Sequence, residues 1–185
     1  MKPRIVPALA LLLSGCGGGP SLPSYGVVPD FRLTDQSGRT FDSESQLEGK
    51  VWVANFIFTT CAGPCPRMTS QFREIRDTAE NAPDLRLVSF TIDPARDTPH
   101  VLAEYGKRFG ADPDRWFFLT GPQADLHSLS RKTFMLGNVD GTLEHSSRFV
   151  LIDRKSRIRG FYDSSDKTKI AELAAHIKAL LKESS

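Results

Sequence analysis

The feature that most constrains the fold is an almost continuous apolar segment, Val51–Phe58, with the sequence VWVANFIF. A short apolar run of this kind is typical of a central strand that is buried on both faces of a sheet. Pro66 then opens a segment in which apolar residues recur at helical spacing, at Met68, Phe72, Ile75 and Ala79. A buried strand that leads directly into an amphipathic helix favours an α/β fold.

Further strands and helices alternate along the rest of the chain. Thr98 is a predicted helix N-cap, with Pro99 at the first helical position. We expect strands at Leu85–Ile92, Trp116–Leu119, Arg148–Asp153 and Arg157–Tyr162, helices at 123–132 and around Ile170–Leu181, and an N-terminal hairpin formed by 31–34 and 39–41. This order predicts a thioredoxin-like α/β fold, in which helices flank a central mixed sheet and the hairpin is an addition.

The N-terminus has the layout of a secretory signal. Lys2 and Arg4 precede an apolar run, Ile5–Leu13, that is too short to span a bilayer. Leu-Ser-Gly-Cys16 resembles a bacterial lipobox, in which the cysteine becomes the lipidated first residue. We therefore predict a lipoprotein signal peptide at 1–15, lipidated Cys16 with a flexible Gly/Pro/Ser-rich tether at 16–29, and a single domain at 30–185. A plain signal peptide or an uncleaved anchor remains the alternative.

This layout predicts a lipid-anchored protein of the bacterial cell envelope, which faces the periplasm or the outer side of the cytoplasmic membrane. Of the 185 residues, 39% are hydrophobic, which suits one globular domain and excludes a disordered chain. The net charge of +2 comes from Lys2 and Arg4, so the chain after residue 15 carries equal numbers of basic and acidic residues. Such a balance argues against nucleic acid as a partner, and we expect a monomer.

Two cysteines follow the apolar strand, in the sequence Cys61-Ala-Gly-Pro-Cys65-Pro66. Their spacing of about one helical turn allows the two sulfurs to meet, either as a disulfide or around a soft metal ion. The start of a helix also favours the thiolate form of a nearby cysteine. A purely structural disulfide is less plausible, because a loop of three residues restrains little of the chain.

One of the four histidines is placed to join the two cysteines. Cys61 and Cys65 follow one predicted strand and Asp93 follows the next, at the edge where ligand sites collect in such sheets. If the strand that begins at Arg148 is antiparallel to these two, His145 starts at the same edge. His100, His127 and His176 are interpreted as surface or packing residues, and Met68 as a core residue.

Two thiolates and one imidazole are a suitable donor set for copper, either Cu(I) or Cu(II). Zinc is the competing ion, but structural zinc normally takes four protein ligands. On these residues alone, the pair Cys61 and Cys65 remains a candidate either for metal binding with His145 or for thiol chemistry.

Several ordered segments together resemble the Sco/SenC family of copper-binding, thioredoxin-like proteins. They are the cysteine segment Phe58–Pro66, the stretch Thr91–Pro99 with the sequence TIDPARDTP, the stretches Tyr105–Asp112 and Trp116–Gly121, and the segment from His145 to Asp153. The resemblance implies copper ligation by Cys61, Cys65 and His145. It also implies a role in assembling the dinuclear copper site in subunit II of a cytochrome c oxidase, by delivering copper or by reducing cysteines there.

The resemblance also places Asp93 beside the site, where it would tune the metal or contact a partner; a role in the local turn is the alternative. Asp97 is interpreted as a capping or turn residue. The insert Ala62-Gly63-Pro64 lacks the acidic residue common in better-known family members. We therefore predict a copper chaperone, with a membrane-tethered thiol–disulfide oxidoreductase that uses the same cysteine pair as the alternative and a thiol peroxidase as a lesser option.

Overall fold

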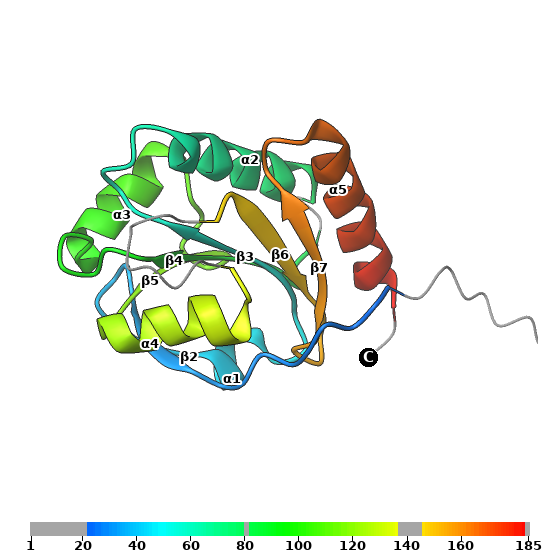
Figure 1. Cartoon of the computed structure of the whole chain (residues 1–185), viewed down its shortest axis with the longest axis horizontal. Helices are drawn as coiled ribbons and strands as arrows, with labels where there is room; N and C mark the ends of the chain where they lie inside the picture. The colour runs from blue at the N-terminus through cyan, green and yellow to red at the C-terminus, as the bar shows by residue number, and fades with distance from the viewer. Residues whose placement is uncertain (1–21, 80–81, 137–145, 184–185) are drawn as a thin grey trace, which may run out of the picture.

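A seven-stranded mixed sheet forms the centre of the molecule, with strand order β2-β1-β5-β4-β3-β6-β7 (Figure 1). The computed structural model describes residues 22–79, 82–136 and 146–183. The elements are β1 (Arg32–Asp35), β2 (Thr40–Asp42), α1 (Ser43–Leu47), β3 (Val51–Ile57), α2 (Pro64–Thr78), β4 (Leu85–Thr91), α3 (Pro99–Arg108), β5 (Trp116–Thr120), α4 (Gln123–Ser128), the π-helical turn η1 (Leu129–Thr133), β6 (Arg148–Ile152), β7 (Ile158–Asp163) and α5 (Lys167–Lys182).

The sheet is mixed in the manner that the sequence predicts. Strands β3, β4 and β5 are mutually parallel, with Val51 level with Leu85 at the start of the first pair. Strand β6 is antiparallel to β3, and β7 and the β1–β2 hairpin are antiparallel additions at the two sides. The carboxyl ends of β3 and β4 and the beginning of β6 therefore share one edge of the sheet. We call this the cysteine edge, because Cys61 follows β3 there.

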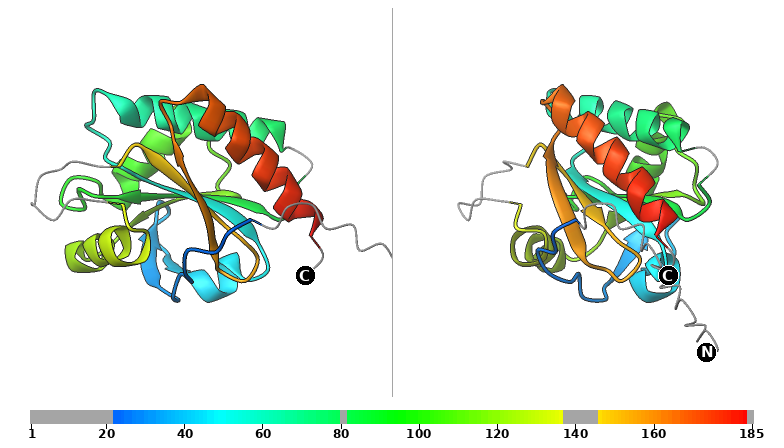
Figure 2. Two further views of the ribbon diagram at one scale, coloured as in Figure 1. Left: turned by 45° about the vertical axis from the view of Figure 1, so that its right-hand side comes forward. Right: turned by 90° about the vertical axis from the view of Figure 1, so that its right-hand side faces the viewer.

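Apolar residues on the two faces of the sheet build two core layers. On one face α2, α3 and α5 bury Phe72, Leu102 and Leu173 against the strands. On the other face α1, α4 and the hairpin cover Trp52 and Phe56. Figure 2 shows the two helical layers from the side. Burial of β3 on both faces explains why its sequence is almost continuously apolar.

The segment predicted as one helix at 123–132 divides into α4 and the π-helical turn η1. The wider turn lets the Phe134 amide donate to the Leu129 carbonyl oxygen. The Phe134 ring then packs against Trp52, Phe56 and Phe90. A tertiary contact thus overrides the simple helical repeat. The short helix α1 is a further element that the apolar pattern did not indicate.

The chain from Leu22 to Val28 runs beside β7 and is held against the domain (Figure 2). The Tyr25 amide donates to the Ile158 carbonyl oxygen at 2.9 Å, and the Arg159 guanidinium donates to the carbonyl oxygens of Leu22 and Pro23. Half of the predicted tether at 16–29, residues 22–28, thus lies against β7 and the turn before it, while Cys16 and the predicted signal peptide lie outside the described residues. Within the described part of the chain, no helix is long and apolar enough to cross a membrane.

Candidate metal and redox site

The two cysteines lie at the cysteine edge, one on either side of the start of α2. Cys61 is half-buried in the turn after β3, where its amide donates to the Phe58 carbonyl oxygen at 3.2 Å. Cys65 is fully buried in the first turn of α2, one residue after Pro64 at the first helical position. The two side chains are thiols that contact one another, and no disulfide joins them. The predicted juxtaposition of strand end, cysteine pair and helix start is therefore confirmed.

Burial dominates the electrostatics of Cys65. It raises the pKa of the Cys65 thiol to about 12, and the Cys61 thiol and the Asp97 carboxylate act in the same direction, while the Phe58 backbone amide hydrogen-bonds the sulfur and opposes them. The prediction that the helix start favours a thiolate is therefore wrong for this cysteine, since desolvation is the largest influence on its pKa and disfavours the charged form. Cys65 holds its proton at neutral pH, and a metal ion has to displace that proton.

A buried carboxylate, which the sequence analysis interprets as a capping or turn residue, contacts the cysteine turn. Asp97 is fully buried, and its oxygens accept hydrogen bonds from the Thr59 amide at 3.1 Å and from the Thr59 hydroxyl at 2.5 Å. The Thr91 hydroxyl donates to it at 2.5 Å. Thr98 serves as the N-cap of α3 instead, as predicted. A helix has one N-cap residue, and Thr98 fills that position in α3, so the adjacent Asp97 is available for another contact. This is the feature of the sequence that could have indicated the role of Asp97.

Asp93, the acidic residue expected beside the site, organises the turn after β4. Its carboxylate forms an ion pair with Arg96 at 2.8 Å, and its carbonyl oxygen accepts from the amides of Arg96 and Asp97. Its own amide donates to the Thr91 hydroxyl oxygen at 3.0 Å. These contacts are those of a turn residue, and a role for Asp93 toward a metal or a partner stays a prediction.

His145 lies outside the described residues, but the chain on its C-terminal side is described. Strand β6 pairs with β3 so that Trp52 is opposite Ile152 and Ala54 is opposite Val150. Since the two strands are antiparallel, β6 begins at Arg148 toward the edge of the sheet at which β3 ends. The antiparallel direction predicted for this strand is confirmed, and the described chain therefore resumes after His145 at the cysteine edge.

Ser164, in the connection after β7, ties the start of β6 to the cysteine helix. Its amide donates to the Ser147 carbonyl oxygen at 2.8 Å. Its carbonyl oxygen accepts from the Gln71 side-chain amide of α2, also at 2.8 Å. Ser164 is buried and thus connects two segments by hydrogen bonds. One bonded residue, Ser147, is two positions after His145, and the other, Gln71, is six positions after Cys65.

The other histidines and Met68 have the surroundings expected of surface and packing residues. Met68 is fully buried in the core beneath α2. The His176 ring nitrogen Nδ1 is 2.7 Å from the Tyr162 hydroxyl, and His100 is exposed at the start of α3. Among residues 22–79, 82–136 and 146–183, no three His, Cys, Asp or Glu side chains gather into a metal site.

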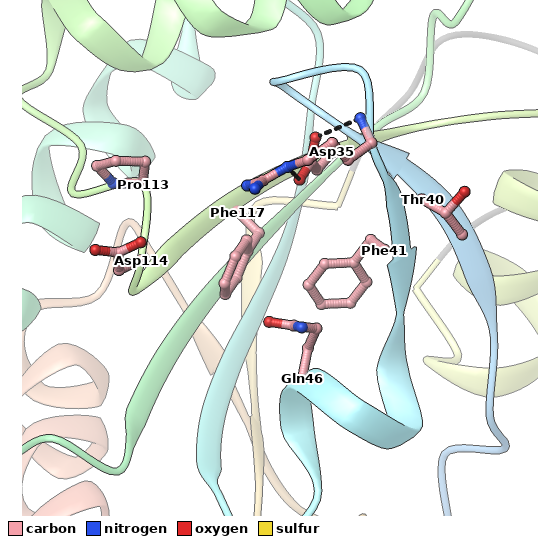
Figure 3. A pocket seen from close by; sticks show the side chains of 8 residues that line it. Asp35, Thr40, Phe41, Gln46, Pro113, Asp114 and Phe117 are labelled. Carbon is pink, nitrogen blue, oxygen red and sulfur yellow. Dashed lines mark hydrogen bonds and ion pairs between the residues drawn. The ribbon is translucent and has the colours of Figure 1, made fainter.

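A cavity of about 340 Å³ lies elsewhere, between the β1–β2 hairpin and the start of β5 (Figure 3). Phe41 and Phe117 line it with Asp35. Asp35 is already engaged, because its carboxylate accepts from the amides of Ser37 and Arg39 and so closes the hairpin turn. Since β5 begins at this cavity, the cavity lies toward the sheet edge opposite the cysteines. It is therefore not part of the cysteine site.

Comparison with known proteins identifies the relatives of this fold and site. A SCO1/SenC family model matches residues 21–182. A SCO1/SenC family lipoprotein from Bacillus anthracis is 31% identical, with a TM-score of 0.76 over 84% of this chain and 95% of that one. BsSco, described as a Sco family cytochrome c oxidase assembly protein with a disulfide switch, is 28% identical, with a TM-score of 0.75 over 89% and 98%. Copper-bound ScoI from Bradyrhizobium japonicum is 26% identical, with a TM-score of 0.68 over 84% and 99%. The thioredoxin-like fold is thus confirmed, and the chain belongs to the SCO1/SenC family.

Proposed function

We propose that this protein binds copper through Cys61, Cys65 and His145 and serves in the assembly of the dinuclear copper site of a respiratory cytochrome c oxidase. The observation that supports the proposal is the shared sheet edge, at which the cysteine pair follows the end of β3 and β6 begins, three residues after His145. Thiolate and imidazole ligands suit both Cu(I) and Cu(II). Copper-bound ScoI and the assembly protein BsSco, both similar in fold over most of their length, support this assignment.

The unequal exposure of the two cysteines suits reversible transfer. Half-buried Cys61 is the sulfur that an incoming protein reaches first, whereas buried Cys65 remains inside the domain. Copper supplies a centre at which ligands exchange one at a time, and the chain keeps the second sulfur in place during that exchange. The recipient is a copper and thiol protein such as subunit II of the oxidase.

A second function, thiol–disulfide exchange, is favoured by the contact between the two thiols. Here the Cys61 thiolate attacks a partner disulfide, forms a mixed disulfide and releases one partner thiolate. Cys65 then loses its proton and attacks the Cys61 sulfur, which releases the second partner thiol and leaves a Cys61–Cys65 disulfide. The disulfide switch described for BsSco supports this alternative.

We further propose that the mature chain begins at lipidated Cys16 and is anchored to a membrane of the bacterial cell envelope, with its domain on the outer side. The similar Bacillus anthracis protein is described as a lipoprotein, which supports this location. Because the chain is held against β7 from Leu22 onward, only the few residues between Cys16 and Leu22 would separate the domain from the lipid.

Copper titration of the mature chain, reduced and in the presence of a competing chelator, tests the ligand set. We expect one copper per chain, loss of binding in Cys61→Ser and Cys65→Ser, and affinity at least about tenfold weaker in His145→Ala, because each ligand fills one coordination position. His127→Ala, on the opposite face of the sheet, is the matched control and should bind normally. Undiminished affinity in His145→Ala would exclude the three-ligand site. The oxidoreductase would be favoured by two results together: the wild type binds no copper, and His145→Ala still turns over a disulfide substrate.

A further inference from the structure

We propose that Asp97 is a positioning residue that holds the cysteine turn in the conformation in which the two thiols meet. This inference rests on the proposed function, because it concerns the same cysteine pair. Asp97 belongs to the connection between β4 and α3, and its side chain reaches across to Thr59, which lies 38 positions earlier in the sequence. Its hydrogen bonds connect the chain after β4 to the turn after β3.

Asp97 accepts hydrogen bonds from both the backbone and the side chain of Thr59. The Thr59 hydroxyl donates to Oδ1 of Asp97, and the Thr91 hydroxyl at the end of β4 donates to Oδ2, while the Thr59 amide donates to both carboxylate oxygens. These three donors are neutral, and the carboxylate that accepts from them is 0% exposed. Hydrogen bonds from neutral donors to a buried carboxylate are short and directional, so they fix the position of Thr59 relative to β4.

Fixing Thr59 fixes both sulfurs. Phe58, the preceding residue, hydrogen-bonds the Cys65 sulfur through its amide, and its carbonyl oxygen accepts from the Cys61 amide. A shift of Thr59 therefore moves the donor to one cysteine and the backbone support of the other. Asp97 acts on the cysteine pair through this turn and needs no direct bond to either sulfur.

The equilibrium between dithiol and disulfide reports this positioning without any metal. Oxidised glutathione accepts two electrons from Cys61 and Cys65, the two thiols lose their protons, and a disulfide and two molecules of glutathione result. A turn that holds the thiols together favours ring closure. In Asp97→Ala, we expect the equilibrium constant for disulfide formation to fall about tenfold, which corresponds to ~30 mV toward a more positive midpoint potential.

Asp97→Asn separates position from charge. An asparagine retains one oxygen for the Thr59 amide, and the threonine hydroxyls can rotate to accept from its amide group. We therefore expect Asp97→Asn to stay within about threefold of the wild-type equilibrium constant, since hydrogen bonding is retained while the charge is lost. Thr59→Val, which removes only the hydroxyl, should shift the equilibrium in the same direction as Asp97→Ala but less, and it provides the readout if Asp97→Ala does not fold.

The control for general loss of stability is Leu180→Ala, a fully buried residue of α5. It should destabilise the domain and leave the glutathione equilibrium unchanged. The proposal is overturned if both Asp97→Ala and Thr59→Val keep the wild-type equilibrium, or if Asp97→Asn shifts it as far as Asp97→Ala does. Copper titration is a separate measurement, so absence of copper binding would contradict the proposed function and leave this result intact.

Discussion

Two buried aspartates hold turns at opposite edges of the sheet, and they do so with different partners. At the cysteine edge, Asp97 accepts hydrogen bonds from the hydroxyls of Thr59 and Thr91 and from the Thr59 amide. At the other edge, Asp153 follows β6 and accepts from the guanidinium groups of Arg157 at 2.8 Å and Arg159 at 2.7 Å. Neutral groups donate to Asp97, whereas two guanidinium groups donate to Asp153 in addition to two neutral turn amides.

The difference suits the work done at each edge. A guanidinium beside the cysteines would favour their thiolates and would repel a bound cation such as copper. Hydroxyl donors hold the cysteine turn without adding positive charge. The opposite edge has no such restriction, so the Asp153 cluster uses charge to fix both the β6–β7 turn and the N-terminal segment, which Arg159 holds through the carbonyl oxygens of Leu22 and Pro23.

The largest expected effect comes from breaking the charged cluster. In Asp153→Asn, the guanidinium of Arg159, whose side chain is 6% exposed, loses its counter-charge inside the protein. We expect the free energy of unfolding at pH 7 to fall by about 3 kcal/mol, as is typical when one partner of a buried ion pair is removed. Urea denaturation of wild type and variant measures the difference.

A second aspartate gives the matched control for that experiment. Asp84 also contacts two cations, Lys50 and Arg154, but its side chain is 41% exposed. Asp84→Asn should cost less than about 1 kcal/mol, because water screens an exposed pair. Equal losses in Asp84→Asn and Asp153→Asn would show that burial does not set the strength of the Asp153 cluster.

The sheet and its direction were predictable because they depend on local patterns. The apolar run at 51–58 predicts β3, and Thr98 with Pro99 predicts the start of α3. The helix α1 was missed because its five residues are too few to show a helical repeat, and Asp42 fixes its start by accepting from the Glu44 amide. The docking of residues 22–28 was also missed, since it depends on Arg159, far along the chain.

The site was predictable only in part, for a similar reason. Spacing places Cys61 and Cys65 at the end of β3, where the structure has them. The same spacing says nothing about burial, and burial is what raises the pKa of Cys65. The direction of that pKa shift was therefore not predictable from the spacing. The contact between Asp97 and Thr59 joins the chain after two neighbouring strands, 38 positions apart in the sequence, and leaves no periodic signal. The position of His145 relative to the cysteines stays a prediction.

Acid should weaken the charged edge in a way that identifies Asp153. Burial alone would raise the pKa of its carboxyl, but hydrogen bonds from Arg159, the turn amides and Arg157 outweigh burial and lower it. A lowered pKa adds stability above the unfolded value of about 4, and this stability is lost as pH falls through the folded value. The free energy of unfolding should therefore decline more steeply below pH 4 in the wild type than in Asp153→Asn. Equal slopes in urea titrations would contradict the assignment.

The smallest effect is expected at Asp93, which lies at the cysteine edge beside Asp97 but has a cation as its partner. The side chain of Arg96 is 67% exposed, whereas that of Asp93 is 9% exposed, so water screens the 2.8 Å ion pair from the Arg96 side. Arg96→Ala should leave urea stability close to the wild-type value. It should also keep the glutathione equilibrium of Cys61 and Cys65 within about twofold of wild type, because an ion pair with one exposed partner contributes little.

Arg96→Ala and Asp97→Ala together compare a charged and a neutral set of partners within one connection of the chain. Both alter the connection between β4 and α3, but only Asp97 bonds to Thr59 in the cysteine turn. If Arg96→Ala shifted the disulfide equilibrium as far as Asp97→Ala, the whole connection would act on the thiols, and the distinction between neutral and charged partners would fail. An effect confined to Asp97 would mean that the cysteine edge depends on hydrogen-bonded geometry, and that its nearest ion pair serves only the turn.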